Sequence, residues 1–361
     1  MIRPWSGVSL PGMLFAMLLA GLPASALAGQ APVVEAPAGA MSGEALEGDI
    51  RVFRGIPYAR APVGQLRWKP PVAAAHWDGV RDATRFGPAC HQPPSRPGSI
   101  YALDEPLPMS EDCLSLNVWT PADAAGAPVF VWIHGGSLVA GSGREPMYDG
   151  AALAARGLVV VTINYRLGVL GYLAHPQLSE ESADGVSGNY GLLDQVEALR
   201  WVERNIAAFG GDPGNVTIAG ESAGALSVMY LMAAPSARGL FDRAIAQSAY
   251  MISMPALRVA AHGAPPAEES GLELSRKIGV RGLPRLRAMD PQELTVKAAT
   301  SGFFPLGNVD GEVLPYQLVD AFDRGAQAPV PILAGFNDGE IRSLRFLLPP
   351  APADAAAYEA E

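Results

Sequence analysis

The fold of this chain is decided by residues 216–232, which read VTIAGESAGALSVMYLM. The first four residues are apolar or β-branched, as is typical of a buried strand, and residues 225–232 have the composition of a helix. Between them lies a G-x-S-x-G motif centred on Ser222. A strand, a tight turn and a helix form the context in which this motif exposes a nucleophilic serine. The motif alone is a weak signal, since a Gly-rich turn with a structural serine has the same letters.

Short apolar runs of strand length recur along the chain, and such runs suit strands buried on both faces of a parallel sheet. We expect strands at residues 129–133, 159–163, 216–219, 244–246 and 331–334. Helical patterns lie between them, the clearest at residues 192–206, where Glu197 is expected off the apolar face. Residues 49–59 favour antiparallel edge strands, and residues 256–300 favour a helical insertion. The alternation predicts an α/β fold with a mostly parallel central sheet and helices on both faces.

Charge and composition exclude several classes of protein. The 361 residues include 26 basic and 36 acidic residues, a net charge of −10, with no basic stripe. Nucleic acid is therefore not an expected partner, because phosphate binding depends on clustered Lys and Arg. Apolar residues make up 49% and charged residues 17%, which excludes a disordered chain.

The N-terminus has the pattern of a secretory signal peptide. Arg3 supplies the positive charge, an apolar run follows, and Ala26-Leu27-Ala28 matches a small-x-small cleavage site. We expect residues 1–28 to be removed after Ala28, which leaves one domain at 29–361 in the periplasm or outside the cell. An uncleaved anchor is the alternative, although the run is short for a span. No later stretch reaches the apolar length of a membrane span.

The chain has two cysteines, Cys90 and Cys113. In an oxidising compartment we expect them to form a disulfide, and two free buried thiols are the alternative. Two cysteines cannot build a four-cysteine zinc site, and no His, Asp or Glu cluster has ligand spacing. We expect no metal and no cofactor.

A second motif with catalytic meaning is His134-Gly135-Gly136-Ser137, which directly follows the strand expected at 129–133. Hydrolases with a nucleophile elbow place a Gly-rich loop here, and its backbone N–H groups bind the tetrahedral oxyanion. We assign this role to the N–H groups of Gly136 and Ser137, together with that of Ala223. His134 precedes the loop at a strand end, so we interpret it as structural rather than as the general base.

With these motifs in place, the chain resembles the type B carboxylesterases, a family of α/β-hydrolases that also contains the cholinesterases. The other matching stretches are FRGIPYA at 53–59, SEDCLSLNV at 110–118, NYRLG at 164–168, GNYGLLDQ at 188–195 and FDRAI at 241–245. The resemblance runs from about residue 30 to 345. It implies an α/β-hydrolase fold and cleavage of a small carboxylic ester through an acyl-enzyme on Ser222. It also supports the Cys90–Cys113 disulfide, which is placed where the family has its first.

The resemblance also implies a catalytic acid, a Glu that follows a strand in the pattern G-x-x-x-x-E. Residues 335–340, GFNDGE, fit this pattern and point to Glu340. Asp338 is the rival, because an Asp-Gly turn could also present a carboxylate. Glu221, beside the nucleophile, matches a family carboxylate to which we assign no proton transfer.

The general base is missing from the sequence. In this fold the chain order is Ser, acid, His, and none of the five histidines follows Glu340. We therefore expect a chain that lacks the C-terminal part of the family fold, with His262 as an alternative base. Two functions stay open: an ester hydrolase, and a non-catalytic binding protein on the same fold. The sequence specifies neither the ester nor the oligomeric state.

Overall fold

The computed structural model describes Met1, residues 31–94 and residues 107–340. The expected signal peptide and the Ala-rich end of the chain lie outside the described residues. The strands are β1 (Val33–Ala36), β2 (Gly39–Ser42), β3 (Glu44–Leu46), β4 (Ile50–Pro57), β5 (Val80–Asp82), β6 (Ser115–Pro121), β7 (Ala127–Ile133), β8 (Val159–Ile163), β9 (Gly211–Glu221), β10 (Arg243–Gln247) and β11 (Ile332–Gly335). The helices are α1 (Ala151–Ala154), α2 (Gly168–Tyr172), α3 (Pro176–Glu181), α4 (Tyr190–Asn205), α5 (Ala223–Ala233), α6 (Ala267–Lys277), α7 (Leu283–Ala288), α8 (Pro291–Thr300) and α9 (Leu318–Asp323).

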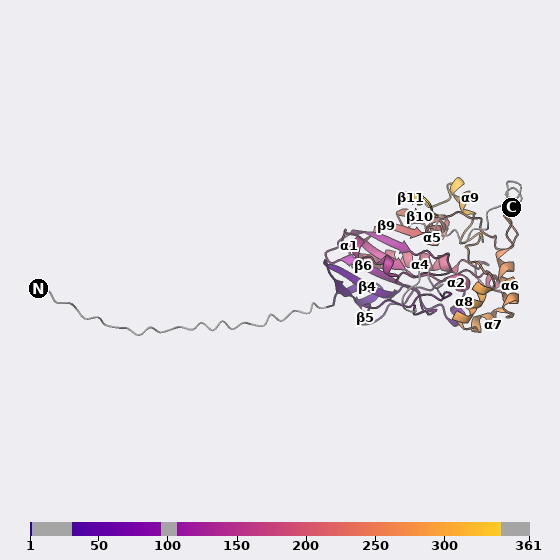
Figure 1. Cartoon of the computed structure of the whole chain (residues 1–361), viewed down its shortest axis with the longest axis horizontal. Helices are drawn as coiled ribbons and strands as arrows, with labels where there is room; N and C mark the ends of the chain where they lie inside the picture. The colour runs from indigo at the N-terminus through magenta and orange to yellow at the C-terminus, as the bar shows by residue number, and fades with distance from the viewer. Residues whose placement is uncertain (2–30, 95–106, 341–361) are drawn as a thin grey trace. The chain divides into compact units, whose positions relative to one another are not determined.

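A mixed eight-stranded sheet forms the centre of the fold, in the order β11-β10-β9-β7-β8-β6-β4-β3 (Figure 1). The neighbours among β11, β10, β9, β7 and β8 pair in parallel. The pairs β8–β6, β6–β4 and β4–β3 are antiparallel. Every strand expected from an apolar run is present, and β8 has the predicted bounds. Three features were not predicted: β3 and β6 in the central sheet, and a separate sheet of order β1-β2-β5. The carboxyl ends of the parallel strands meet at one edge, where the serine motif lies.

The structure confirms the helices predicted at residues 192–206 and 256–300, with one correction. α4 covers residues of the expected helix, and α6, α7 and α8 form the expected insertion between β10 and β11. Glu197 was expected off the apolar face of α4, but it is 5% exposed. Its carboxylate is paired with Arg204 at 2.8 Å and with Arg200 at 3.6 Å. The two arginines, from the same helix, neutralise the Glu197 carboxylate and so make its burial possible. The apolar pattern alone therefore underestimates how many residues of α4 are buried.

A buried ion pair joins two of the sequence motifs. Arg166 of NYRLG donates from Nε and Nη2 to the two carboxylate oxygens of Asp194 on α4, both at 2.7 Å. The backbone N–H of Arg166 adds a third bond to Asp194 at 3.0 Å. The two side chains are 4% and 0% exposed. Because each charge would be costly to bury alone, the pair fixes the segment after β8 on α4.

The expected disulfide between Cys90 and Cys113 is present, and both residues are buried. The two cysteines are 23 residues apart in sequence. Closing a loop of this length lowers the conformational entropy of the unfolded chain, which stabilises the folded state by about 3 kcal/mol. We therefore expect reduction to lower the free energy of unfolding by about that amount. The measurement is urea denaturation of the oxidised and the reduced protein. Equal midpoints would contradict the prediction, and Cys90→Ala/Cys113→Ala serves as a control that cannot reoxidise.

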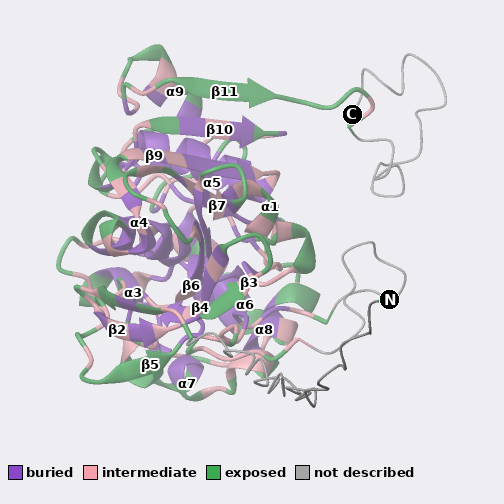
Figure 2. Ribbon diagram, turned by 90° about the vertical axis from the view of Figure 1, so that its left-hand side faces the viewer, coloured by how far each residue is buried: buried purple, intermediate pink, exposed green. Residues whose placement is uncertain are grey.

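The strand β11 ends the sheet as an exposed edge (Figure 2). All four of its residues are exposed, and Leu333 and Phe336 present 68% and 71% of their surface to solvent. An exposed apolar strand edge of this kind can pair with another strand. Among the described residues, no helix has the length and apolarity to cross a membrane.

Candidate active site

Ser222 lies at a sharp turn between the end of β9 and the start of α5. Its backbone has φ 55° and ψ −121°, a left-handed conformation that is strained for a residue with a side chain. The turn is held by the N–H of Ser222, which donates to the Gln247 carbonyl of β10 at 2.9 Å. The serine is half-buried, and its hydroxyl has no hydrogen-bond partner among the described residues. This is the geometry of a nucleophile elbow.

The two glycines of the motif are required by close backbone contacts. A Cβ on Gly224 would lie 2.1 Å from the Ile133 carbonyl oxygen at the end of β7. A Cβ on Gly220 would lie 2.4 Å from the carbonyl carbon of Gly224. Any side chain at either position would therefore push α5 away from the sheet and displace Ser222.

The loop predicted to bind the oxyanion packs directly against the elbow. A Cβ on Gly135 would lie 2.8 Å from the Glu221 carbonyl oxygen and 3.4 Å from the Ser222 Cβ. Gly136 and Ser137 are exposed and have φ 101° and 58°. None of the hydrogen bonds found within the described residues starts from the N–H of Gly136, Ser137 or Ala223. All three expected donors are therefore unpaired beside the serine.

His134 lies beneath this loop as a buried, neutral side chain. Its Nδ1 is 2.9 Å from the Gly135 carbonyl oxygen, and its ring stacks on Tyr165 at 4.5 Å between centroids. The Tyr165 hydroxyl in turn donates to the His134 carbonyl at 2.8 Å. Burial lowers the pKa of His134 to about 4, although the bond to Gly135 opposes this shift. A carbonyl can only accept, so Nδ1 carries the proton.

The bond from His134 fixes the direction of the Gly136 N–H, one of the three predicted oxyanion donors. In a trans peptide the C=O and N–H groups point in opposite directions. The carbonyl of Gly135 points at the His134 ring, so the N–H of Gly136 points away from that ring. Gly141 closes the loop over His134, since a Cβ there would lie 2.3 Å from Nδ1. His134 is thus structural, as expected from its position.

Two carboxylates, Glu221 beside the serine and Glu340 after β11, interact electrostatically. Burial raises the pKa of Glu221, and the negative charge of Glu340 raises it further. Glu340 follows β11, and its Oε2 accepts a hydrogen bond from the Asn337 N–H at 2.7 Å. Asp338, the rival acid, makes no hydrogen bond or ion pair with the described residues. The assignment of Glu340 rather than Asp338 as the acid stays a prediction.

None of the five histidines, all of which are described, forms a hydrogen bond with Ser222 or Glu340. The Nδ1 of His76 lies 3.1 Å from the Pro37 carbonyl oxygen. The Nδ1 of His91 lies 2.9 Å from the Gln292 Oε1. His175 accepts from the Gln177 N–H at 3.2 Å. His262 is exposed in a turn with φ 53°. The structure does not bring His262, the alternative base, into contact with the serine.

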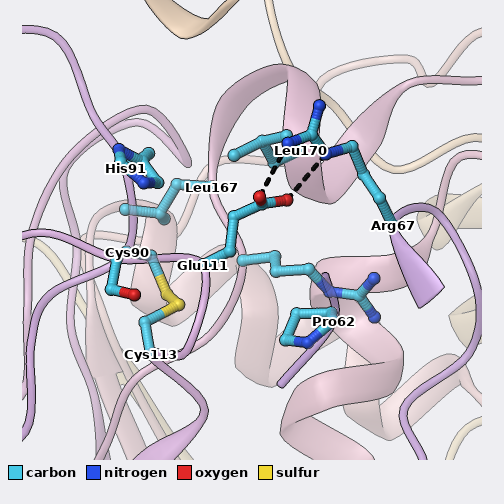
Figure 3. A pocket seen from close by; sticks show the side chains of 10 residues that line it. Pro62, Arg67, Cys90, His91, Glu111, Cys113, Leu167 and Leu170 are labelled. Carbon is cyan, nitrogen blue, oxygen red and sulfur yellow. Dashed lines mark hydrogen bonds and ion pairs between the residues drawn. A yellow bond between two sulfur atoms is a disulfide. The ribbon is translucent and has the colours of Figure 1, made fainter. Parts of the chain in front are cut away.

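A small cavity beside the disulfide is separate from this site (Figure 3). Arg67 and Glu111 line it and form a bidentate pair with distances of 2.7 and 2.6 Å. The cavity volume is about 10 Å³, which is room for about one water molecule. It is too small for an ester, and the Arg67 guanidinium also donates to Met289 of the helical insertion at 2.8 Å. The pair ties the loop at Glu111 to that insertion.

Comparison with known proteins agrees with this geometry. The model of the carboxylesterase family matches residues 30–359. The chain belongs to the carboxylesterase family. It is 46% identical over 318 residues to the fumonisin B1 esterase of Sphingopyxis macrogoltabida, covering 85% of this chain and 56% of that protein. It is 41% identical to the para-nitrobenzyl esterase of Bacillus subtilis, covering 81% of this chain and 60% of that one.

Solved structures of carboxylesterases have the same fold. A Geobacillus stearothermophilus carboxylesterase matches with a TM-score of 0.76 and 43% identity, covering 87% of this chain and 63% of that one. A thermophilic PNB esterase matches with a TM-score of 0.79 and 35% identity, covering 91% and 67%. The α/β-hydrolase expectation is therefore confirmed. The chain spans 56–60% of the length of the two curated carboxylesterases named above.

Sequence reasoning missed two residues that shape the site. Gln247 supplies the carbonyl that holds the turn at Ser222, and Tyr165 donates to the His134 carbonyl below the loop predicted to bind the oxyanion. Tyr165 belongs to the NYRLG motif, so the sequence marked its position, but it did not indicate what the residue does. Gln247 follows a short apolar run and has no local signal, because its contact with Ser222 arises from the pairing of β10 with β9.

Proposed function

We propose that this chain carries the nucleophile, the oxyanion hole and the acid of a serine hydrolase for carboxylic esters. The strained backbone of Ser222 and its unpaired hydroxyl, beside three unpaired backbone N–H groups, support this proposal most directly. Such strain is retained at functional sites, because a structural serine in a turn would gain nothing from it. Each oxyanion donor contributes about 3 kcal/mol to transition-state stabilisation.

In the proposed reaction the Ser222 Oγ attacks the ester carbonyl carbon, and its proton passes to a base. The carbonyl oxygen becomes an oxyanion that accepts hydrogen bonds from Gly136, Ser137 and Ala223. Collapse expels the alcohol and leaves an acyl-enzyme, which water then hydrolyses to the carboxylic acid. Glu340 would orient a histidine base and stabilise its imidazolium form. That base is none of the five histidines in their observed positions.

The proposal is tested with an activated ester and an added base. Residues 29–361 are mixed with 4-nitrophenyl acetate, and imidazole in solution supplies the base that none of the five histidines provides in its observed position. We expect release of 4-nitrophenol to rise more steeply with imidazole in the wild-type chain than in Ser222→Ala, where only the background cleavage by imidazole itself remains. Equal rates in the two proteins at every imidazole concentration would overturn the proposal, since imidazole alone also cleaves this ester.

His134 gives a prediction about pH. An unfolded histidine titrates near 6.5, and the folded pKa is about 4, so the unfolded state binds more protons between these values. The stability contributed by neutral His134 is therefore complete above pH 6.5 and is lost as the pH falls toward 4. The full loss is about 3 kcal/mol. Urea denaturation from pH 7 to 4 should show a shallower loss in His134→Phe than in the wild type.

The matched control for this prediction is His76→Phe, because His76 is exposed. This variant should keep the wild-type dependence on pH. An unchanged dependence in His134→Phe would show that His134 is not the buried neutral group described here. His134→Phe should also slow any imidazole-supported ester cleavage, because the Gly135 carbonyl loses the donor that orients the Gly136 N–H.

A non-catalytic binding protein is the second candidate. The observation in its favour is that Ser222 contacts no histidine among the described residues. A binding protein has no need of a strained serine with unpaired donors, so the esterase proposal is the stronger. The imidazole experiment separates the two, because a binding protein gives no serine-dependent cleavage.

We also propose that the chain is exported, with cleavage after Ala28. The disulfide supports this, since such bonds persist in oxidising compartments. N-terminal sequencing of the protein recovered from the periplasm or medium tests it. A mature protein that still begins at Met1 would contradict it.

A further inference from the structure

Away from the serine, three arginines line an open hollow with a volume of about 560 Å³. Arg54, Arg85 and Arg144 converge there from three separate segments, and we call the hollow the arginine cleft. Phe86, Pro88 and Pro108 supply apolar walls, and no Asp or Glu lines it among residues 31–94 and 107–340. Sites for small molecules have volumes of about 300–1,000 Å³ and combine apolar walls with a few polar groups.

The arginine cleft is distinct from the ester site. Arg54 belongs to β4, which is separated from β9 by β6, β8 and β7 in the sheet. Four strand spacings of about 4.8 Å place β4 roughly 19 Å from the strand that carries Ser222. A ligand in the arginine cleft therefore does not occupy the ester site.

The three cations differ in how far they are neutralised. Arg54 is ion-paired with Glu44, and it also donates to the Thr84 carbonyl at 3.1 Å. Arg85 has Asp82 nearby, whose pKa is lowered by hydrogen bonds from Thr84 and also by the charge of Arg85. Neither carboxylate lines the cleft.

Arg144 is the one of the three arginines that no described carboxylate neutralises. It donates to the Gly87 carbonyl at 3.3 Å, and it forms no ion pair with the described residues. Among the residues that the structure describes, the cleft thus has a local excess of positive charge in a chain whose net charge is −10. Since a guanidinium presents a planar fork of donors that matches a carboxylate, Arg144 is the natural anchor for an anion.

Phe86 organises the cleft between two of its cations. The guanidinium carbons of Arg54 and Arg144 lie 5.1 and 5.6 Å from the centre of its ring. Cation–π contacts at these distances hold both side chains near the ring face. The cleft therefore offers positioned cations next to an aromatic and proline wall, a combination that suits an anion with a flat apolar body.

We propose that the arginine cleft is a second ligand site that binds small aromatic carboxylates, with Arg144 as the main contact for the carboxylate. Arg85 adds positive charge at the mouth, and the Phe86 and proline walls contact the apolar body. The site is open to solvent, so binding is weak and depends on salt. It is independent of Ser222 and of the proposed ester hydrolysis.

The test is a titration of the full chain with 4-fluorobenzoate followed by ¹⁹F NMR. The neutral amide 4-fluorobenzamide has the same shape without the charge, and inorganic phosphate has the charge without the ring. We expect saturable binding of 4-fluorobenzoate that weakens in 0.5 M NaCl. We expect at least tenfold weaker binding in Arg144→Gln, since a charge-assisted bond contributes about 1.5–3 kcal/mol.

Two variants make the result specific. Arg156→Gln removes an exposed arginine elsewhere and should leave the dissociation constant unchanged. Ser222→Ala should also leave it unchanged, which separates this site from the ester site. Circular dichroism melting confirms that Arg144→Gln is folded. Equal binding of 4-fluorobenzoate by Arg144→Gln and wild type, or equal binding of the amide or of phosphate, would overturn the proposal.

Discussion

Replacing Ser222 with alanine is expected to abolish acyl-enzyme formation. The Oγ atom forms the bond to the acyl group, and no neighbouring side chain takes its place at the strained turn. In an active serine hydrolase, loss of the nucleophile lowers kcat by about 10⁶-fold. Mass spectrometry of the chain after reaction with 4-nitrophenyl acetate and imidazole should show one added acetyl group on wild type and none on Ser222→Ala.

The matched control is Ser253→Ala, because Ser253 is an exposed serine that makes no hydrogen bond with the described residues. It should be acetylated like the wild type. Peptide mapping should place the acetyl group on Ser222. An acetyl adduct of equal yield on Ser222→Ala would identify a different nucleophile, and the elbow would then be structural.

The sequence predicted most of what is local in this fold. The buried strands were recognised because a parallel strand carries its own apolar run, and β8 was predicted to the residue. The elbow was recognised because strand, glycine turn and helix are adjacent in sequence. The sheet β1-β2-β5 was missed because its strands have only three or four residues each, and because β5 pairs with β2 across a long stretch of chain.

The features that sequence could not provide depend on contacts between distant residues. The arginine cleft joins Arg54, Arg85 and Arg144, which no periodicity or motif connects. The burial of Glu197 depends on the cations that pair with it, and hydrophobic patterning takes no account of such pairs. The direction of the Gly136 N–H follows from a bond to His134 that only the folded loop defines. Motifs therefore locate the chemistry, whereas the packing of neighbouring segments sets its geometry.

The polypeptide of the printed sequence is expected to turn over esters slowly when no base is added. Ser222 has no histidine within hydrogen-bond distance among the described residues, so its hydroxyl is not activated. The oxyanion donors and substrate binding alone leave a rate of about 10³–10⁴ over water. That is far below an ordinary enzyme turnover of about 10 s⁻¹. The measurement is steady-state hydrolysis of 4-nitrophenyl acetate by purified residues 29–361.

The outcome that contradicts this prediction is informative about the base. A turnover near 10 s⁻¹ without imidazole would mean that a histidine of this chain reaches Ser222 in solution. His262 is the first to test, because it is exposed in a turn and makes no hydrogen bond with the described residues. His262→Ala would then lose the activity, whereas His76→Ala would keep it. If the wild type turns over slowly, as we expect, neither His262→Ala nor His76→Ala should change the rate. Imidazole should then raise the rate equally in both variants.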